Sequence, residues 1–347
     1  MAYTTIKKPS DYFNTKLWTG TGSSNALTGV GFQPDWTWIK NRTDANSHVL
    51  QDAVRGVGNT IISNNTDAES AEGAGDLTAF GSDGFTVGTN GRVNGSGKSM
   101  VAWNWLGANG TASNTDGSIT STVSANTTSG FSIVSFTGTG ATATVGHGLG
   151  VKPDLIIAKN RTDAVDWYVY HSSLGATKNL RLNQTSAELT ESAPWDNTEP
   201  TTSVISVNNA NGTNGSSKNL IFYCFADKQG YSKFGSYTGN GNADGPFIYT
   251  GFKPAWILIK HSGGGTAGGE QWNLQDVKRS TYNPSIVMLS PNTNDADNST
   301  TNNSLDILSN GFKVRTVDNR LNNSGATYIY MAFAEEPLVG DNPATAR

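Results

Sequence analysis

Short apolar runs alternate with polar turn segments along the whole chain. Runs such as Leu155–Ala158 and Ile221–Phe225 contain β-branched and aromatic residues and are bounded by turn-forming residues. This pattern predicts β-strands of a few residues joined by tight turns. An unbroken apolar run such as Leu155–Ala158 further indicates a strand that is buried between two layers. The hydrophobic pattern therefore predicts an all-β protein.

The same pattern of phrases occurs three times. Each copy contains a Thr-Gly phrase, or a Thr-Gly-Asn-Gly variant of it, and a proline follows 14 or 15 residues after its first glycine. These glycines and prolines are Gly20 and Pro34, Gly138 and Pro153, and Gly239 and Pro254. Each copy then closes with a strongly apolar strand: Met100–Trp105, Leu220–Phe225 and Tyr328–Phe333. Such self-similarity indicates three diverged copies of one module of about a hundred residues.

Composition sets the expected boundaries of these copies. Roughly seven short strands in about a hundred residues are typical of a two-sheet sandwich, so we predict three tandem β-sandwich modules of the jelly-roll type. The expected segments are 1–107 for the first repeat with an N-terminal strap, 108–129 for a polar linker, 130–227 for the second repeat, 228–336 for the third repeat and 337–347 for a C-terminal strap. Because a long polar linker permits reorientation, we expect the second and third repeats to be joined more rigidly than the first.

Charge and cysteine content narrow the classes of function. Charged residues make up 15% of the chain and the net charge is −4, so the clustered basic face of a nucleic-acid-binding protein is not expected. The single cysteine, Cys224, excludes an intrachain disulfide. The N-terminal residues lack the apolar stretch of a secretory signal, and no apolar run has the length of a membrane span. We therefore expect folding in a cytoplasm, without membrane insertion.

Two glycine-rich segments imitate catalytic motifs. Gly91–Ser99 resembles a phosphate-binding loop, but Arg92 occupies the position of its first glycine, and the equivalent loops of the other repeats lack the motif. We interpret it as a hairpin turn. His147 lies in a second glycine-rich segment and has no orienting partner at comparable positions in the other repeats, so a turn is favoured there too. The sequence thus predicts no catalytic residue and no cofactor.

Two candidate ligand sites remain. The loop Asn292–Asn298 is rich in oxygen ligands, and Asp295 and Asp297 would hold calcium there, although the loop lacks the glycine and distal glutamate of an EF-hand and a plain surface loop is the alternative. Trp195 lies in a loop with no counterpart in the other two repeats. We predict that it is exposed and stacks on a ligand, with core packing as the alternative.

Distinctive phrases extend from one end of the chain to the other. They are Ala2–Ile6, Pro9–Phe13, Ser113–Ile119, Phe234–Gly245, Tyr328–Glu335 and Pro343–Arg347. With these phrases the whole chain resembles virion structural proteins of tailed bacteriophages, especially marine ones. The resemblance implies a non-catalytic component of the particle, often labelled tail-fibre or structural protein, with lectin-like jelly-roll modules.

The resemblance also implies a place and partners. We expect a protein of the virion surface, assembled in the cytoplasm of the host bacterium as a tail-fibre or adhesin-type appendage. Expected partners are other virion proteins of the tail, the portal-proximal region or the capsid, further copies of the chain, and host-surface carbohydrate, but no nucleic acid. One alternative is a capsid decoration or head-fibre protein. Another is a polysaccharide-degrading tailspike, which would need paired carboxylates in one cleft.

Overall fold

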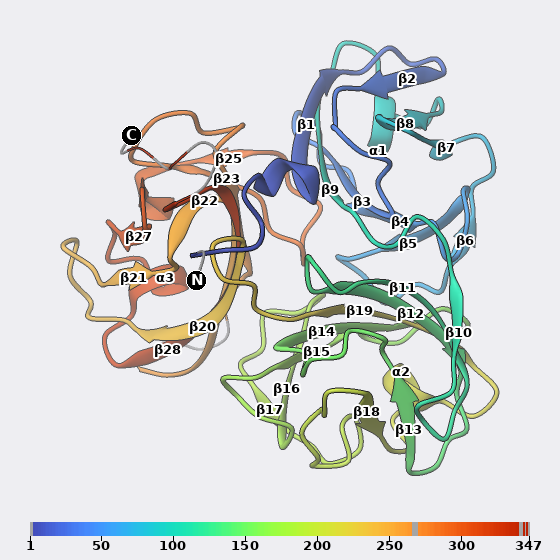
Figure 1. Cartoon of the computed structure of the whole chain (residues 1–347). Coiled ribbons are helices and arrows are strands. Elements are labelled where there is room, and N and C mark those ends of the chain that lie inside the picture. Colours follow the sequence, from blue (N-terminus) through green and yellow to red (C-terminus); the bar gives the residue numbers. More distant parts are fainter. Residues whose placement is uncertain (1–2, 266–269, 340–342, 344, 346–347) are drawn as a thin grey trace.

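Antiparallel strands make up most of the regular structure (Figure 1). The computed structural model describes residues 3–265, 270–339, 343 and 345. The fold is all-β and sandwich-like, as the hydrophobic pattern predicts, and each repeat contributes one larger and one smaller sheet. In Figure 1 the blue, green and orange sets of sheets lie around a common centre.

In the first repeat, six strands form the larger sheet in the order β1-β9-β3-β4-β5-β6. Their bounds are β1 Phe13–Thr19, β9 Ser99–Trp105, β3 Trp36–Asn41, β4 Val49–Asp52, β5 Asn59–Ile62 and β6 Ser70–Ala71. The smaller sheet has the order β2-β8-β7, with β2 Asn25–Thr28, β8 Gly84–Val87 and β7 Leu77–Gly81.

The larger sheet of the second repeat has eight strands in the order β10-β11-β12-β19-β14-β15-β16-β17. They are β10 Ala112–Asn114, β11 Ser121–Asn126, β12 Phe131–Thr137, β19 Asn219–Phe225, β14 Leu155–Asn160, β15 Tyr168–His171, β16 Lys178–Arg181 and β17 Leu189–Thr190. The smaller sheet pairs β13 Ala143–Gly146 with β18 Val204–Val207. All six residues of β14 are buried, and burial of the first four is what their unbroken apolar run predicts.

The third repeat arranges β20-β28-β22-β23 in its larger sheet and β21-β27-β26 in its smaller one. The bounds are β20 Ser232–Thr238, β28 Ala326–Pro337, β22 Phe252–Gly264, β23 Asn273–Asp276, β21 Phe247–Tyr249, β27 Gly311–Val314 and β26 Leu305–Leu308. A further pair joins β24 Val287–Met288 to β25 Asn298–Ser299. The short helices of the described chain are α1 Gly91–Asn94, α2 Asn211–Asn214 and α3 Asn319–Asn322, with 3-10 turns η1 Pro9–Asp11 and η2 Thr301–Asn303.

The repeated Thr-Gly phrase is explained by a close approach between two loops. A Cβ atom on Gly20 would lie 2.1 Å from the carbonyl oxygen of Gly95, just after α1, so only glycine fits. The buried Asn94 at the end of α1 fixes the same loop, because its Oδ1 accepts a hydrogen bond from the Thr21 N–H at 3.0 Å. Equivalent bonds are made by Asn214 to the Thr139 N–H and by Asn322 to the Asn240 N–H, both at 2.8 Å.

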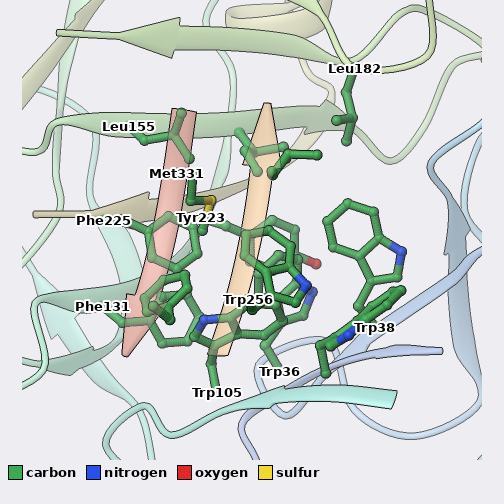
Figure 2. Packing of buried hydrophobic residues seen from close by; sticks show 14 of the residues in the cluster. Trp36, Trp38, Trp105, Phe131, Leu155, Leu182, Tyr223, Phe225, Trp256 and Met331 are labelled. Atoms are coloured by element: carbon green, nitrogen blue, oxygen red, sulfur yellow. The ribbon is translucent and has the colours of Figure 1, made fainter. Parts of the chain in front are cut away.

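The larger sheets are covered on both sides. On the outer side each repeat has its own apolar core, shared with its smaller sheet. On the inner side all three repeats contribute to one central core (Figure 2). There the Trp36 and Tyr223 rings stack with their centroids 4.3 Å apart, and Trp105 meets Trp256 edge to face at 5.7 Å. The three repeats are therefore joined through aromatic packing.

Buried lysines also link the repeats, in a cyclic order. The lysine that ends the apolar strand of each repeat donates a hydrogen bond to a backbone carbonyl of the preceding repeat. The bonds run from Lys159 to Thr66 at 2.8 Å, from Lys260 to Thr185 at 2.7 Å and from Lys40 to Asn294 at 3.2 Å. Because the first repeat is bonded to the third in the same way as the second to the first, the three repeats close into a ring.

The segment 108–129 differs from the polar linker that its composition suggests. It contains β10 and β11, and β11 pairs with β12 from Thr122 to Asn126. Ile119 is buried and its N–H donates a hydrogen bond to the Thr144 carbonyl at 3.0 Å. Polar side chains are compatible with strands here because the ladder is made by backbone groups, which any residue except proline provides. The segment thus fixes the second repeat and does not act as a hinge.

The N-terminal strap lies against the third repeat. The Tyr3 hydroxyl donates a hydrogen bond to the Gly251 carbonyl at 2.6 Å, and Thr4 Oγ1 donates one to the Gln229 carbonyl at 2.6 Å. The expected C-terminal strap begins with Pro337, which ends β28. Met1 and Ala2 of the first strap and most of residues 340–347 of the second lie outside the described residues.

Candidate functional site on the third repeat

A buried ion-pair network joins the first and second repeats, and sequence reasoning did not single it out. Arg55 Nε contacts Asp52 Oδ2 at 2.5 Å, and the Tyr223 hydroxyl donates to the same oxygen at 2.7 Å. The two carboxylate oxygens of Glu69 form ion pairs with Arg55 Nη1 at 2.9 Å and with Arg161 Nη2 at 2.8 Å. Because guanidinium groups pair with the carboxylates of both Asp52 and Glu69, we interpret the network as a structural link between the first and second repeats.

An equivalent network joins the third repeat to the first. Trp103 Nε1 donates to Asp276 Oδ2 at 3.0 Å, and Arg279 contacts both Asp276 and Asp297, at 2.5 and 2.8 Å. Burial lowers the pKa of Arg279, but the carboxylates of Asp276 and Asp297 outweigh this and raise it above its ordinary value. The sequence signal for both networks is the repeated Gln-Asp-x-x-Arg at 51–55 and 275–279.

The calcium candidates do not form a cation site. Asp297 lies between two guanidinium groups, because Arg42 Nε contacts its second oxygen at 2.7 Å. A calcium ion there would have to displace both arginines. Asp295 is exposed in irregular chain two residues before Asp297. Over the described ranges, no group of three or more His, Cys, Asp or Glu residues is placed to hold a metal ion.

Trp195 is buried, in contrast to the exposed position predicted for it. Its side chain is 1% exposed and its ring packs edge to face against Tyr170 and Phe222, with centroids 6.0 and 6.1 Å away. The smaller sheet of the second repeat has two strands, whereas that of the first has three. Trp195 belongs to the core beneath this narrower sheet, so it cannot stack on a surface ligand.

The two glycine-rich segments that resemble catalytic motifs have structural roles. Gly91–Asn94 forms the four-residue α1, and the strand β9 begins at Ser99, where a phosphate-binding loop would continue into a long helix. His147 is buried, its Nδ1 accepts a hydrogen bond from the Leu149 N–H at 3.2 Å, and burial lowers its pKa. Cys224 is buried in β19, and burial raises the pKa of its thiol.

Two exposed aromatic side chains lie on β21, at the edge of the smaller sheet of the third repeat. Phe247 is 46% exposed and Tyr249 is 56% exposed, while Ile248 between them faces the core. Both rings therefore point to the same outer side, because side chains alternate along a strand. The equivalent positions in the other repeats, aligned through the buried Leu27 and Val145, hold Ala26 and Thr28, and Thr144 and Gly146.

A surface pocket of about 310 Å³ lies beside Tyr249. Tyr3 of the N-terminal strap forms part of its wall, and Gly251 lies below the two tyrosines. A Cβ atom on Gly251 would lie 2.8 Å from the Tyr3 hydroxyl and 3.7 Å from the Tyr249 hydroxyl, so glycine leaves room for both groups. Burial is the main cause that raises the pKa of Tyr3 to about 12, and the hydrogen bond with Tyr249 adds to it, so the Tyr3 phenol is neutral at pH 7.

The remaining wall of the pocket is polar. Lys233 Nζ pairs with Asp227 Oδ2, and the other oxygen of Asp227 accepts the Phe234 N–H at 2.7 Å. Burial raises the pKa of Asp227 above its ordinary value, and the ion pair with Lys233 offsets part of this shift. Gln229 is exposed at the rim. The pocket thus combines aromatic faces with hydroxyl, amide and paired charged groups.

Sequence reasoning missed this site, although a signal for it exists. Comparison of the three repeats shows aromatic residues at 247 and 249 where the other copies have small ones. Tyr3 has no such signal, because its position against Gly251 depends on the path of the N-terminal strap.

The fold is that of an all-β, sandwich-like protein. The chain belongs to the family described as domain of unknown function DUF7483, whose sequence profile matches residues 8–337. No curated protein and no solved structure gives a significant match. None of the helices in the described part of the chain could span a membrane.

Proposed function

We propose that this protein is a non-catalytic structural protein displayed on the surface of a tailed-phage particle, as a tail-fibre or adhesin-type appendage. The end-to-end sequence resemblance to virion proteins motivates this proposal. The structural observation that supports it most is that the three similar repeats expose different residues on their edge strands. The third repeat has an edge strand with exposed aromatic residues beside a pocket. The corresponding strands of the first and second repeats carry small residues instead.

The rigid connection of the repeats supports a role in which the protein holds a binding partner on the particle surface. The central aromatic core and the cyclic lysine bonds fix the third repeat relative to the first. A partner bound at one repeat is then held in a defined orientation relative to a particle attached at another. The pocket on the third repeat offers one carboxylate in its described lining, Asp227, and Lys233 is bound to it. Glycoside hydrolysis usually requires two carboxylates across a cleft, so this pocket lacks the pair that a tailspike enzyme would need there.

Labelling of intact particles tests this proposal. Gold-conjugated antibodies against the purified protein should bind at the tail or its appendages, and added purified protein should compete with particles for host adsorption. Labelling of the capsid with normal adsorption would instead support the alternative of a decoration or head-fibre protein. Absence of the protein from purified particles would contradict both.

A further inference from the structure

We propose that the pocket formed by Tyr3, Tyr249 and Gly251, extended by Phe247, is a carbohydrate-binding site. The inference rests on the proposed function, since it names the ligand class that the displayed surface would contact. Sugar rings present apolar C–H faces edged by hydroxyl groups. A matching site therefore needs exposed aromatic faces together with fixed polar groups.

The aromatic faces are available and held in place. Tyr249 and Phe247 project from one side of β21, and the strand is anchored because Ile248 is buried opposite Phe312. The Tyr3 ring is fixed by its 2.6 Å hydrogen bond to the Gly251 carbonyl. Side chains that are already ordered lose little conformational entropy when a ligand binds.

The polar groups suit a polyhydroxylated ligand. Gln229 at the rim can both donate and accept hydrogen bonds, and the tyrosine hydroxyls lie together above Gly251. The charges of Asp227 and Lys233 neutralise each other, so the pocket has no excess charge that would favour an ionic ligand. These groups match the hydroxyl groups of a neutral sugar segment.

The size of the site argues against a protein partner. A stable protein interface buries roughly 800 Å² on each partner and has an apolar centre. Here the exposed rings are few, and on the sheet face Phe247 is flanked by Lys313, which pairs with Asp244 at 2.8 Å. The pocket volume of about 310 Å³ falls at the lower end of the range for small-ligand sites.

Binding of the full-length protein to an array of purified bacterial O-polysaccharides and capsular polysaccharides tests the proposal. The strongest array polysaccharide would then be titrated against Tyr249→Ala, Phe247→Ala and a control, Tyr282→Ala, which removes an aromatic side chain that is 83% exposed in the same repeat. We expect the first two variants to weaken binding about tenfold or more and the control to bind normally. Melting temperatures verify that all three variants are folded.

Any of three results would overturn the inference: no polysaccharide on the array is bound, Tyr249→Ala and Phe247→Ala bind as tightly as the unmodified protein, or the control variant loses as much affinity as Tyr249→Ala. None of these results affects particle labelling, so failure of the carbohydrate site is distinguishable from failure of the proposed function. Loss of labelling with retained polysaccharide binding would have the opposite meaning.

Discussion

Three buried histidines are each held in one neutral tautomer. In every case Nδ1 accepts a hydrogen bond, which leaves no lone pair there for a proton. The donors are Trp38 Nε1 to His48 at 3.0 Å, the Leu149 N–H to His147 at 3.2 Å and the Ser173 N–H to His171 at 3.1 Å. Nε2 of His171 lies 3.2 Å from the Tyr330 carbonyl, so this nitrogen carries the hydrogen.

Acid should therefore destabilise the protein before its carboxylates titrate. Burial lowers the pKa of His171 to about 4, whereas an unfolded imidazole takes up a proton near pH 6.5. Stability contributed by neutral His171 is thus complete above about pH 6.5 and is lost as the pH falls toward 4, with a loss of about 2 kcal/mol at pH 5. Urea unfolding at pH 7.5, 6 and 5 measures this loss. His171→Gln should reduce it, and an unchanged pH dependence in the variant would contradict the assignment.

Buried lysines have the opposite effect on the alkaline side. Burial lowers the pKa of Lys260 to about 7, while an unfolded lysine stays protonated to about pH 10.4. As the pH rises above 7, the folded lysine loses its proton and the unfolded one keeps it, so the free energy of unfolding increases. We expect a gain of about 2 kcal/mol between pH 7 and pH 9 from Lys260.

Lys260→Met should remove this gain, and denaturant unfolding at pH 7, 8 and 9 would detect the change. Lys98→Met provides the matched control, because the Lys98 side chain is 39% exposed. If both variants keep the full rise in stability, the lysine assignment fails.

At the scale of elements, two of the three junctions between repeats share one arrangement, in which a side chain on the closing strand donates a hydrogen bond to an aspartate of the neighbouring repeat. The closing strand places Tyr223 on Asp52 and Trp103 on Asp276. At the junction of the second and third repeats the corresponding residues are Met331 and His171, and Leu174 replaces the arginine. Met331 and His171 line a small apolar cavity there. Loss of the donor therefore coincides with loss of the ion pair.

Restoring part of this arrangement tests this correspondence. Leu174→Arg alone should lower stability by about 1–3 kcal/mol, because it places an unpaired charge at a partly buried position. Adding His171→Asp should recover part of that loss through an ion pair like that of Asp52 and Arg55, and a double-mutant cycle from chemical denaturation measures the coupling. Ser173→Arg, at an exposed neighbouring position, should cost little. Additive effects at 171 and 174 would contradict the prediction.

The strands are predictable from the sequence because their signals are local. Apolar runs such as Leu155–Ala158 specify buried strands whatever their neighbours are. The strands in 108–129 were missed because the pairing of β10 with β11 and of β11 with β12 uses backbone groups and leaves the side chains polar. Trp195 was missed because its burial depends on a strand that the second repeat lacks. The pocket was missed because the N-terminal strap brings Tyr3 to it across 248 positions of sequence.

At the scale of the whole molecule, the shared core makes the repeats interdependent. Removal of residues 1–107 would take away Phe13, Trp36 and Trp105 and expose Tyr223 and Trp256, against which they pack. We therefore expect the fragment 108–347 to lack a cooperative thermal transition, although the sequence alone suggested a rigid unit of the second and third repeats. Near-UV circular dichroism and dye binding would show lost side-chain packing.

A milder change in the full-length chain checks the same reasoning. Trp36→Ala should lower stability by about 3–5 kcal/mol and still leave a single transition, because it opens a cavity in a core that remains closed around it. A fragment 108–347 that melts cooperatively with native-like near-UV signal would demonstrate that the repeats fold independently.

The ring of repeats also has a consequence for how a nascent chain reaches its final form. Trp36 and Trp105 leave the ribosome long before Trp256 and Phe333, the third-repeat rings that meet Trp105 in the core. Throughout that interval the first repeat presents a bare aromatic face, which is the kind of surface that chaperones cover. The core is complete only once β28 has been synthesised, after all the other strands that contribute to it. Prematurely terminated chains would keep this aromatic surface exposed and would be degraded or aggregate. Intact copies would therefore predominate among the chains that accumulate.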